Sequence, residues 1–511
     1  MNAVLHDICW ILPELCLILG LIIVFVVGLK KSNPWLFMGI AKPFVLASVF
    51  LVFVKPDSDG TSWVFSFHLE NLGSQLIFAN SLAVDSWARV FKILIYLAAL
   101  FPLWFGLRSK EISKTYHLEF VSLILASIIG MSFLVGASDL LVIYISMEMV
   151  SLFSYVLASF RKSNVLSNEA GIKYMLFGAF ASGTMLYGMS LLFGLTGSLN
   201  LGDISSHLVD ISGTPPLLLL SCVLIFAGFA YKISAVPLHM WTPDVYEGAP
   251  TPVSSFFSVV PKIAGFAVLI RFFLTALSQP LPDIAGQWSV LSPGIWPFWV
   301  AVVSALTMTV GNLAALSQSN LKRLLAYSTI AHSGYILMGF VVLKDVGLSA
   351  IVYYLFVYAF MKLGAFYVVI CVEEKSPHIV PLNAQIQNFK GLAWKSPLLG
   401  VVMAIFLFSL IGVPPTGGFF GKFYLFKVAL ESGFFWLVLV ALLNTVVSLY
   451  YYAKILKAMF FEKPVSGSQN SAPAFSLAWD QSYILVFLSA GVMIFGVFAE
   501  FFVQWFKVVI F

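Results

Sequence analysis

The sequence predicts an all-α polytopic membrane protein of about 14 transmembrane helices, with two inverted five-helix repeats that contain broken helices. Of its 511 residues, 60% are hydrophobic and only 10% are charged, and the mean hydropathy is +0.97. Soluble domains carry about 25% charged residues. Apolar runs long enough to cross a bilayer recur along the whole chain, and basic residues gather in alternate loops. Soluble enzymes, secreted domains and nucleic-acid binders are therefore excluded as descriptions of the whole chain.

The predicted spans are apolar runs bounded by charges or by Pro/Gly clusters. They cover residues 8–29, 35–54, 82–106, 118–136, 138–159, 168–194, 216–240, 251–276, 294–316, 322–342, 347–371, 396–428, 432–460 and 481–507. The first run has no basic segment before it, so we expect a retained span and not a cleaved signal peptide. Residues 61–80 alternate between apolar and polar types, which predicts a short hairpin outside the membrane. The Ser/Pro-rich residues 464–475 predict a flexible loop.

Lys and Arg are distributed unevenly between the predicted loops. The odd-numbered loops contain Lys30, Lys31, Arg108, Lys110, Lys114, Arg161, Lys162, Lys322, Arg323, Lys375, Lys390, Lys395, Lys454, Lys457 and Lys463. The even-numbered loops and their flanks contain little beyond Lys55, Arg89, Lys344 and Lys427. Because basic loops favour the cytoplasmic side, both termini are predicted on the non-cytoplasmic side. An even number of spans likewise requires the two termini to lie on the same side of the membrane.

Two predicted spans are interrupted at corresponding places. The run 216–240 breaks at YKISAVP beside Lys232, and the run 396–428 breaks at GVPPTGGFFGKF beside Lys422. These spans are five apart, and an odd offset inverts the topology, as in the inverted repeats of transporters. The pattern predicts N-terminal helices in 1–115, a first repeat in 116–278, a second repeat in 290–462 and a C-terminal helix in 478–511.

Several ionisable residues lie inside or at the mouth of the predicted spans. They are Glu148, Lys232, His239, Lys262, His332, Lys362 and Lys422. An ionised group at a span centre costs about 2.5–3.5 kcal/mol, so these side chains are expected to face the bundle interior, pair with one another or contact water. A neutral buried carboxyl for Glu148 and a snorkelling side chain for Lys232 remain open alternatives. Each of the two histidines could relay protons or could only pack or cap.

This row of Glu, Lys and His side chains predicts the transfer of protons, or of another small cation, through the membrane. No CxxC motif or Cys/His cluster surrounds Cys9, Cys16, Cys222 or Cys371, and no nucleotide-binding glycine loop occurs. We therefore expect no cofactor or metal in this chain. Nothing in the sequence supplies fuel, so transport is expected to be secondary or coupled to a partner protein.

Four stretches are similar to a known family. They read YMLFGAFASGTMLYGMSLLFGLTGSLNL (174–201), VPLHMWTPDVYEGAPTPVSSFFSVVPKIAGF (236–266), GNLAALSQSNLKRLLAYSTIAHSGYILMGF (311–340) and GVPPTGGFFGKF (412–423). They resemble the antiporter-like subunit N (subunit 2) family of respiratory complex I, the proton-translocating NADH:quinone oxidoreductase. The resemblance covers roughly residues 115–430, and HMWTPDVYEGAPTPV is its most specific motif.

The resemblance implies a proton path through Glu148, Lys232, Lys262 and Lys422. In it, Glu148 and Lys232 would form a switching pair, with Lys262 as a bridge. Lys422 would be the donor on the exit side. Lys362 departs from the family pattern, and it would be an extra relay, a partner of Glu148 or a ligand of a lipid head group.

The same resemblance places the redox chemistry in other chains. NADH, FMN, iron–sulfur clusters and quinone are expected in partner subunits, and the partners are the other membrane-arm subunits of complex I in a bacterial inner (plasma) membrane. Three alternatives remain: a subunit of a multisubunit cation/proton antiporter, a subunit of a ferredoxin- or hydrogenase-linked relative of complex I, and a structural subunit whose buried charges only fix helix packing.

Overall fold

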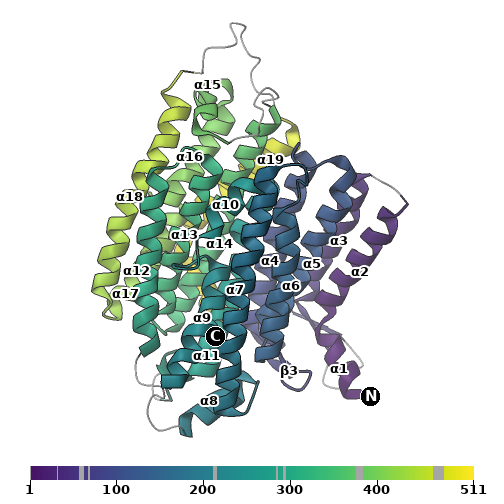
Figure 1. The fold of residues 1–511 in the computed structure, drawn as a ribbon, viewed down its shortest axis with the longest axis vertical. Coiled ribbons are helices and arrows are strands. Elements are labelled where there is room, and N and C mark those ends of the chain that lie inside the picture. Colours follow the sequence, from purple (N-terminus) through teal and green to yellow (C-terminus); the bar gives the residue numbers. More distant parts are fainter. Residues whose placement is uncertain are drawn as a thin grey trace.

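Helices form most of the chain in a computed structural model that describes residues 2–30, 33–56, 63–66, 69–210, 216–282, 286–291, 295–375, 384–463 and 477–510. The α-helices are α1 (Asn2–Trp10), α2 (Leu12–Gly28), α3 (Pro34–Leu51), α4 (Ser86–Arg108), α5 (His117–Gly136), α6 (Leu140–Ala158), α7 (Val165–Thr196), α8 (Leu201–Asp210), α9 (Pro216–Ile233), α10 (Trp241–Gly248), α11 (Thr251–Leu277), α12 (Ile295–Leu316), α13 (Leu321–Phe340), α14 (Asp345–Lys375), α15 (Leu392–Lys395), α16 (Pro397–Ile411), α17 (Gly417–Glu431), α18 (Phe435–Phe460), α19 (Trp479–Val497) and α20 (Ala499–Ile510). Most of the long helices run side by side along one axis (Figure 1).

Eleven of the described helices are long and apolar enough to cross a membrane, and α2 and α16 are shorter apolar helices. The prediction of an all-α polytopic membrane protein is confirmed at this level. Both predicted interruptions are present, because α9 ends at Ile233, inside 216–240, with α10 beginning at Trp241, and 396–428 divides into α16 and α17. The last predicted span, 481–507, is also divided, between α19 and α20.

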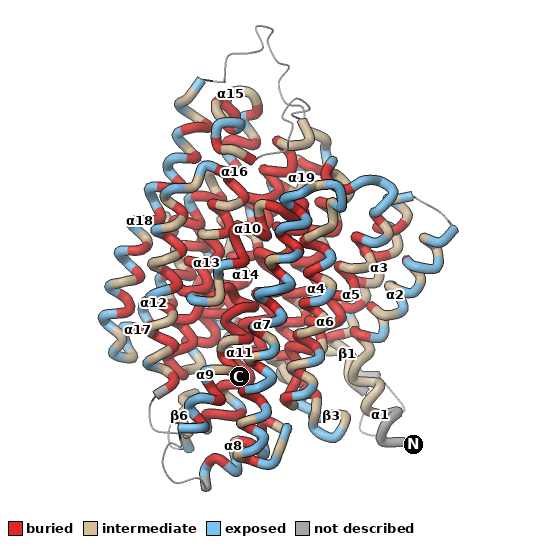
Figure 2. The backbone as a smooth tube through the Cα atoms, viewed as in Figure 1, coloured by how far each residue is buried: buried red, intermediate tan, exposed pale blue. Residues whose placement is uncertain are grey.

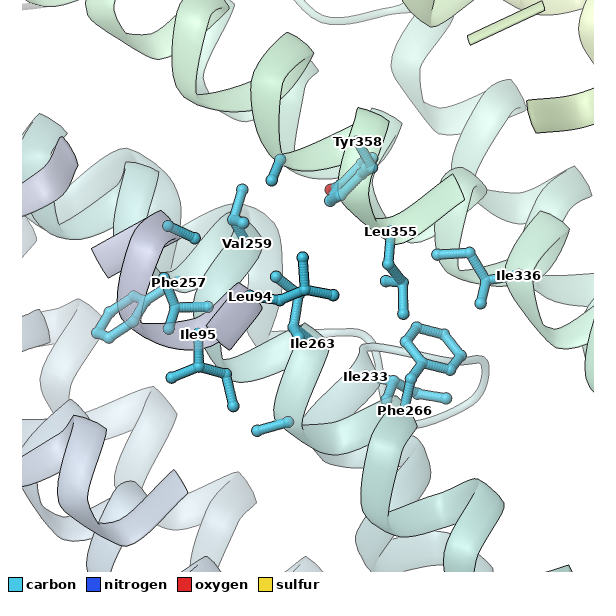
Figure 3. Close-up of a cluster of buried hydrophobic side chains, with 14 of the residues drawn as sticks. Leu94, Ile95, Ile233, Phe257, Val259, Ile263, Phe266, Ile336, Leu355 and Tyr358 are labelled. Carbon is cyan, nitrogen blue, oxygen red and sulfur yellow. The ribbon is translucent and has the colours of Figure 1, made fainter. Parts of the chain in front are cut away.

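The core of the bundle is built around α11 and α14. The most apolar window of α11 is wholly buried and that of α14 is 89% buried, whereas those of α7 and α18 are 33% and 39% buried. Helices that are apolar all round belong in the interior. Figure 2 shows this as buried central helices inside partly exposed outer ones. In Figure 3, apolar side chains from α4, α9, α11, α13 and α14 meet in one cluster, with Ile263 of α11 near its centre.

Polar side chains fix where several core helices begin. Asp85 accepts a hydrogen bond from the Ala88 amide at the start of α4, at 2.8 Å. Asp139 caps α6 in the same way, and Asn320 accepts the amides of the first turn of α13. Such caps satisfy amides that have no partner inside the helix, and each stabilises a helix by about 1 kcal/mol.

Short strands occur in pairs outside the helices. They are β1 (Val54–Pro56), β2 (Trp63–Phe65), β3 (Gln75–Ile77), β4 (Leu82–Val84), β5 (Ser278–Pro280) and β6 (Trp288–Val290). The hairpin predicted within 61–80 is wrong in its pairing: β2 pairs with β1 and β3 pairs with β4, so neither strand pairs inside that segment. Alternation predicts a strand but not its partner. The loop predicted at 464–475 lies outside the described residues.

The two ends of the bundle differ in charge. At one end lie the basic loops, where Arg161 pairs with Glu111 and Arg108 pairs with Asp480. At the opposite end lie both termini (Figure 1): Asp7 accepts the Phe78 amide, and residues 508–510 line a cavity with residues 73–74. We call these the basic end and the terminal end.

Candidate functional site

The break between α9 and α10 creates a polar junction in the core. The Ile233 carbonyl ends α9, where the last carbonyls of a helix have no intrahelical donor. It accepts hydrogen bonds from Lys262 Nζ of α11 at 2.8 Å and from Ser333 Oγ of α13 at 2.7 Å. Lys262 Nζ also contacts Ser333 Oγ at 3.2 Å. The break therefore supplies a neutral acceptor that holds a buried ammonium group between α9, α11 and α13.

The break between α16 and α17 builds a similar junction. Lys422 Nζ donates to the Leu410 and Ile411 carbonyls at 3.0 and 2.9 Å, and it lies 4.7 Å from the centre of the Tyr335 ring. Gly412 ends α16 with a φ of 92°, a conformation that favours glycine. A side chain there would also come within 3.2 Å of the Lys422 stem. The turn thus leaves room for the lysine against the free helix end.

Lys232 lies next to the first break but does not pair with Glu148 in this structure. Its Nζ contacts Ser151 Oγ of α6 at 3.1 Å. Glu148 precedes Ser151 by about one turn of α6, and its side chain is partly buried. Its Oε1 atom is buried and has no hydrogen-bond partner. Residues three apart share a helix face. The carboxyl therefore lies on the side of α6 that Lys232 approaches, in an unpaired state.

His332 is surrounded by aromatic side chains. Its Nδ1 atom lies 2.5 Å from the Tyr354 hydroxyl, and its ring packs against Tyr335 and Tyr358. It follows directly after Ala331 and precedes Ser333, the partner of Lys262. Helix α13 thus places His332 between the two junctions. His239, by contrast, lies in the connection after α9, is only half-buried and has a buried Nδ1 without a partner.

Lys362 lies close to the His332 cluster: its Nζ is 5.9 Å from the centre of the Tyr358 ring, against which His332 packs. Its Nζ donates to the Leu325 carbonyl at 2.9 Å and to Ser328 Oγ at 2.7 Å, and Ser328 is hydrogen-bonded to the Tyr452 hydroxyl of α18. The side chain is fully buried, so it cannot reach a lipid head group. Neither of these hydrogen bonds is to Glu148. The role of Lys362 stays a prediction.

The four core lysines, Lys232, Lys262, Lys362 and Lys422, share one electrostatic feature. Each is at most 3% exposed, and each donates only to hydroxyls or backbone carbonyls. The ion pairs of the described residues involve other side chains, so no carboxylate neutralises these ammonium groups within 4 Å. A proton on one lysine therefore repels a proton on the next, and each lysine can lose its proton without leaving an unpaired anion.

A polar network at the basic end was not predicted from the sequence, although it uses acidic residues of the HMWTPDVYEGAPTPV motif. Asp244 accepts from Lys173 and Arg323, and Glu247 accepts from Arg323 and Asn320. Burial alone would raise the pKa of Asp244, but its hydrogen bonds to the two basic side chains hold that pKa below its ordinary value. The acidic residues of the motif thus fix α10 to α7 and α13.

A buried carboxylate extends this network to the start of α11. Glu111 pairs with Arg161 at 2.6 Å and accepts the Thr251 amide. Burial would raise its pKa, but Lys322 and Arg161 lower it below the ordinary value. Lys322 itself donates to the Ala249 carbonyl at 2.6 Å. Across the described ranges, no three His, Cys, Asp or Glu side chains are grouped closely enough to hold a metal ion.

Comparison with known proteins identifies the family. A family model described as "NADH:quinone oxidoreductase/Mrp antiporter, TM" matches residues 137–448. The NADH-quinone oxidoreductase subunit N of Anaeromyxobacter sp. is 38% identical over 98% of this chain and 96% of its own length. A chain of respiratory complex I from Thermus thermophilus with bound aureothin is 30% identical, with a TM-score of 0.75 over 96% of this chain and 99% of that one. A chain of the Mrp complex from a Dietzia species shares the fold, at 19% identity and a TM-score of 0.77 over 98% and 97% of the two chains. The resemblance in the four motifs is confirmed, and the chain belongs to the NADH-quinone oxidoreductase subunit N family.

Proposed function

We propose that this chain is a proton-conducting membrane-arm subunit of a proton-translocating NADH:quinone oxidoreductase (complex I). The observation that carries the proposal is the row of buried lysines without carboxylate partners, held by hydroxyls and by carbonyls at two helix breaks. Such groups can bind and release protons in turn, because they donate to neutral acceptors and the loss of a proton breaks no ion pair. Quinone reduction in partner subunits would drive the protonation changes.

Each residue has a role in this proposal. Glu148 and Lys232 form the switching pair, which the unpaired Glu148 carboxyl supports as an open state. Lys262 bridges the two halves through the Ile233 carbonyl and Ser333. Lys422 is the donor on the exit side. His332 and Lys362 are additional relay groups, and His239 lies at an inlet.

The proposal includes the finer architecture. Fourteen spans would arise if each pair of half-helices at a break counts once, with inverted repeats in 116–278 and 290–462 between the helices of 1–115 and 478–511. The support is the parallel between the two junctions. Lys262 of α11 binds the carbonyl end of α9, and Lys422 of α17 binds the carbonyl end of α16. NADH, FMN, iron–sulfur clusters and quinone would bind other subunits of the assembly.

The orientation follows from the charge difference between the two ends. The basic end would face the cytoplasm of a bacterial cell, and both termini would lie on the outer side of the inner (plasma) membrane. The shared fold with a chain of the Mrp complex favours a second candidate, a cation/proton antiporter. Sodium transport in vesicles without a redox donor would support that candidate instead.

Replacement of Lys232 tests the proposal. In the assembled complex in membrane vesicles, Lys232→Met is expected to lower quinone reduction and proton translocation by about tenfold, which corresponds to about 1.4 kcal/mol. Lys427→Met is the matched control, because Lys427 lies on the exposed side of α17 and only approaches Glu431 at 4.0 Å. If Lys232→Met lowers the amount of assembled complex while the assembled fraction works normally, the residue has a structural role and the relay is wrong.

A further inference from the structure

A second buried cluster of ionisable side chains lies in the N-terminal helices, outside the lysine row. Lys92 Nζ of α4 pairs with Glu14 Oε1 of α2 at 2.6 Å. Ser132 Oγ of α5 donates to the same carboxylate oxygen at 2.5 Å, and it lies 2.5 Å from the Tyr96 hydroxyl. Glu14 is fully buried and Lys92 is 4% exposed. Three helices therefore meet around one carboxylate.

The second carboxylate oxygen has no protein partner. Glu14 Oε2 is buried without a hydrogen bond. Glu14, Lys92 and Ser132 line a cavity of about 10 Å³, whose other walls are apolar residues that include members of β3 and β4. That is about the volume that one water needs, and buried water usually satisfies such atoms. The strands β3 and β4 lie at the terminal end of the bundle (Figure 1), so a water there would connect the carboxylate toward that end.

Other ionisable groups near the pair bind other residues, although Arg89 Nη2 is buried without a partner. Arg89, one turn before Lys92 on α4, donates to the Gly73 carbonyl at 2.8 Å. Cys16 of α2 donates to the Phe44 carbonyl, and Asp7 of α1 accepts the Phe78 amide. No further acidic or basic side chain of the described residues forms an ion pair with Glu14 or Lys92. Lys92 is therefore the charge that balances the Glu14 carboxylate.

We propose that Glu14 is a proton-exchange site that opens toward the terminal end through a water in this cavity. In uptake, a hydronium ion in the cavity gives a proton to Glu14 Oε2: the new O–H bond forms on the carboxylate and water is left behind. Lys92 keeps its proton, so the site changes from neutral to singly positive. Ser132 and the Tyr96 hydroxyl continue the hydrogen-bonded row into the α4–α5 interface. This site is separate from the lysine row and does not depend on it.

Infrared spectroscopy of the assembled complex tests this proposal. While the complex turns over, a carbonyl band of a protonated carboxyl is expected to appear, to shift in D2O and to be lost in Glu14→Gln. The matched control is Asp480→Asn, which removes a half-buried carboxylate that also pairs with α4, through Arg108. That variant is expected to keep the band.

The double variant Glu14→Gln/Lys92→Met removes both charges of the pair together. It provides the same test if Glu14→Gln alone does not assemble. The proposal predicts that the double variant also lacks the band. It is overturned if the wild-type complex has no such band, if the band stays in either Glu14 variant, or if Asp480→Asn alone removes it. These outcomes concern Glu14 only, so they are independent of the Lys232→Met test of the lysine row.

Discussion

Lys262 in the core and Lys92 in the N-terminal helices are buried to a similar degree but bind different partners. Lys262 donates to a backbone carbonyl and a serine hydroxyl at a helix break, whereas Lys92 faces a carboxylate between continuous helices. Neutral acceptors allow an ammonium group to lose its proton without leaving a charge behind. A carboxylate partner does not, because proton loss from Lys92 leaves the buried Glu14 anion unpaired.

The comparison assigns a physical role to the helix breaks. A continuous helix uses most of its carbonyls for its own amides, so a buried lysine beside it binds a side chain, as Lys232 binds Ser151, or shares a carbonyl that is already in use, as Lys362 shares that of Leu325. A broken helix offers carbonyls inside the core, as Ile233 does for Lys262 and Ile411 does for Lys422. The breaks therefore allow buried lysines to be held without fixed counter-charges, which proton transfer along a row requires.

Removal of one lysine from each region gives the largest expected difference. Lys92→Met leaves the Glu14 carboxylate unpaired and is expected to destabilise the fold by about 3–5 kcal/mol. Lys262→Met is expected to cost about 1 kcal/mol, because Ser333 still donates to the Ile233 carbonyl at 2.7 Å. Thermal unfolding of the two purified variants measures both losses.

A double variant sharpens this measurement. Glu14→Gln/Lys92→Met removes both charges of the pair, so its loss of stability is expected to be smaller than that of Lys92→Met alone. Equal losses in Lys92→Met and Lys262→Met at neutral pH would show that the carboxylate partner makes no difference, and the contrast between the two regions would then be wrong.

Glu148 provides a second way to test the contrast, because it is a carboxyl without an ion-pair partner. Glu148→Ala is expected to lower coupled proton translocation by about tenfold, or about 1.4 kcal/mol. Stability should change little, since Oε1 of Glu148 makes no hydrogen bond that the substitution would remove. Proton uptake by vesicles and thermal unfolding separate the two effects. Normal translocation would remove Glu148 from the path.

The sequence predicts the elements of the site better than their contacts. Lys262 and Lys422 stand out as charges in apolar runs, and Pro237 marks the first break. Their acceptors were not predictable, because Ser333 reaches Lys262 from a helix distant in the chain. Glu14 and Lys92 also lie in predicted spans, but they were not singled out. No local pattern shows that a residue of α2 pairs with one of α4.

The predicted strands illustrate the same limit. Alternation marks residues 75–77 as strand, but the pairing of β3 with β4 depends on a turn that the pattern does not specify. The basic loops are an informative exception, because charge asymmetry acts on whole loops and needs no partner. Their gathering at one end of the bundle could therefore be predicted from composition alone.

Lys362 gives the smallest expected effect and the finest test of the contrast. Like Lys262 it has only neutral partners, but its hydrogen bonds go to Leu325 and to Ser328, which is bonded to Tyr452 of α18, and not to the carbonyl end of a broken helix. If position in the row matters as well as partner type, Lys362→Asn should lower coupled turnover by only about twofold, or about 0.4 kcal/mol. Measured beside Lys232→Met in the same vesicles, a larger loss for Lys362→Asn would mean that protons travel through the α18 branch, and the row through Lys422 would no longer be the main route.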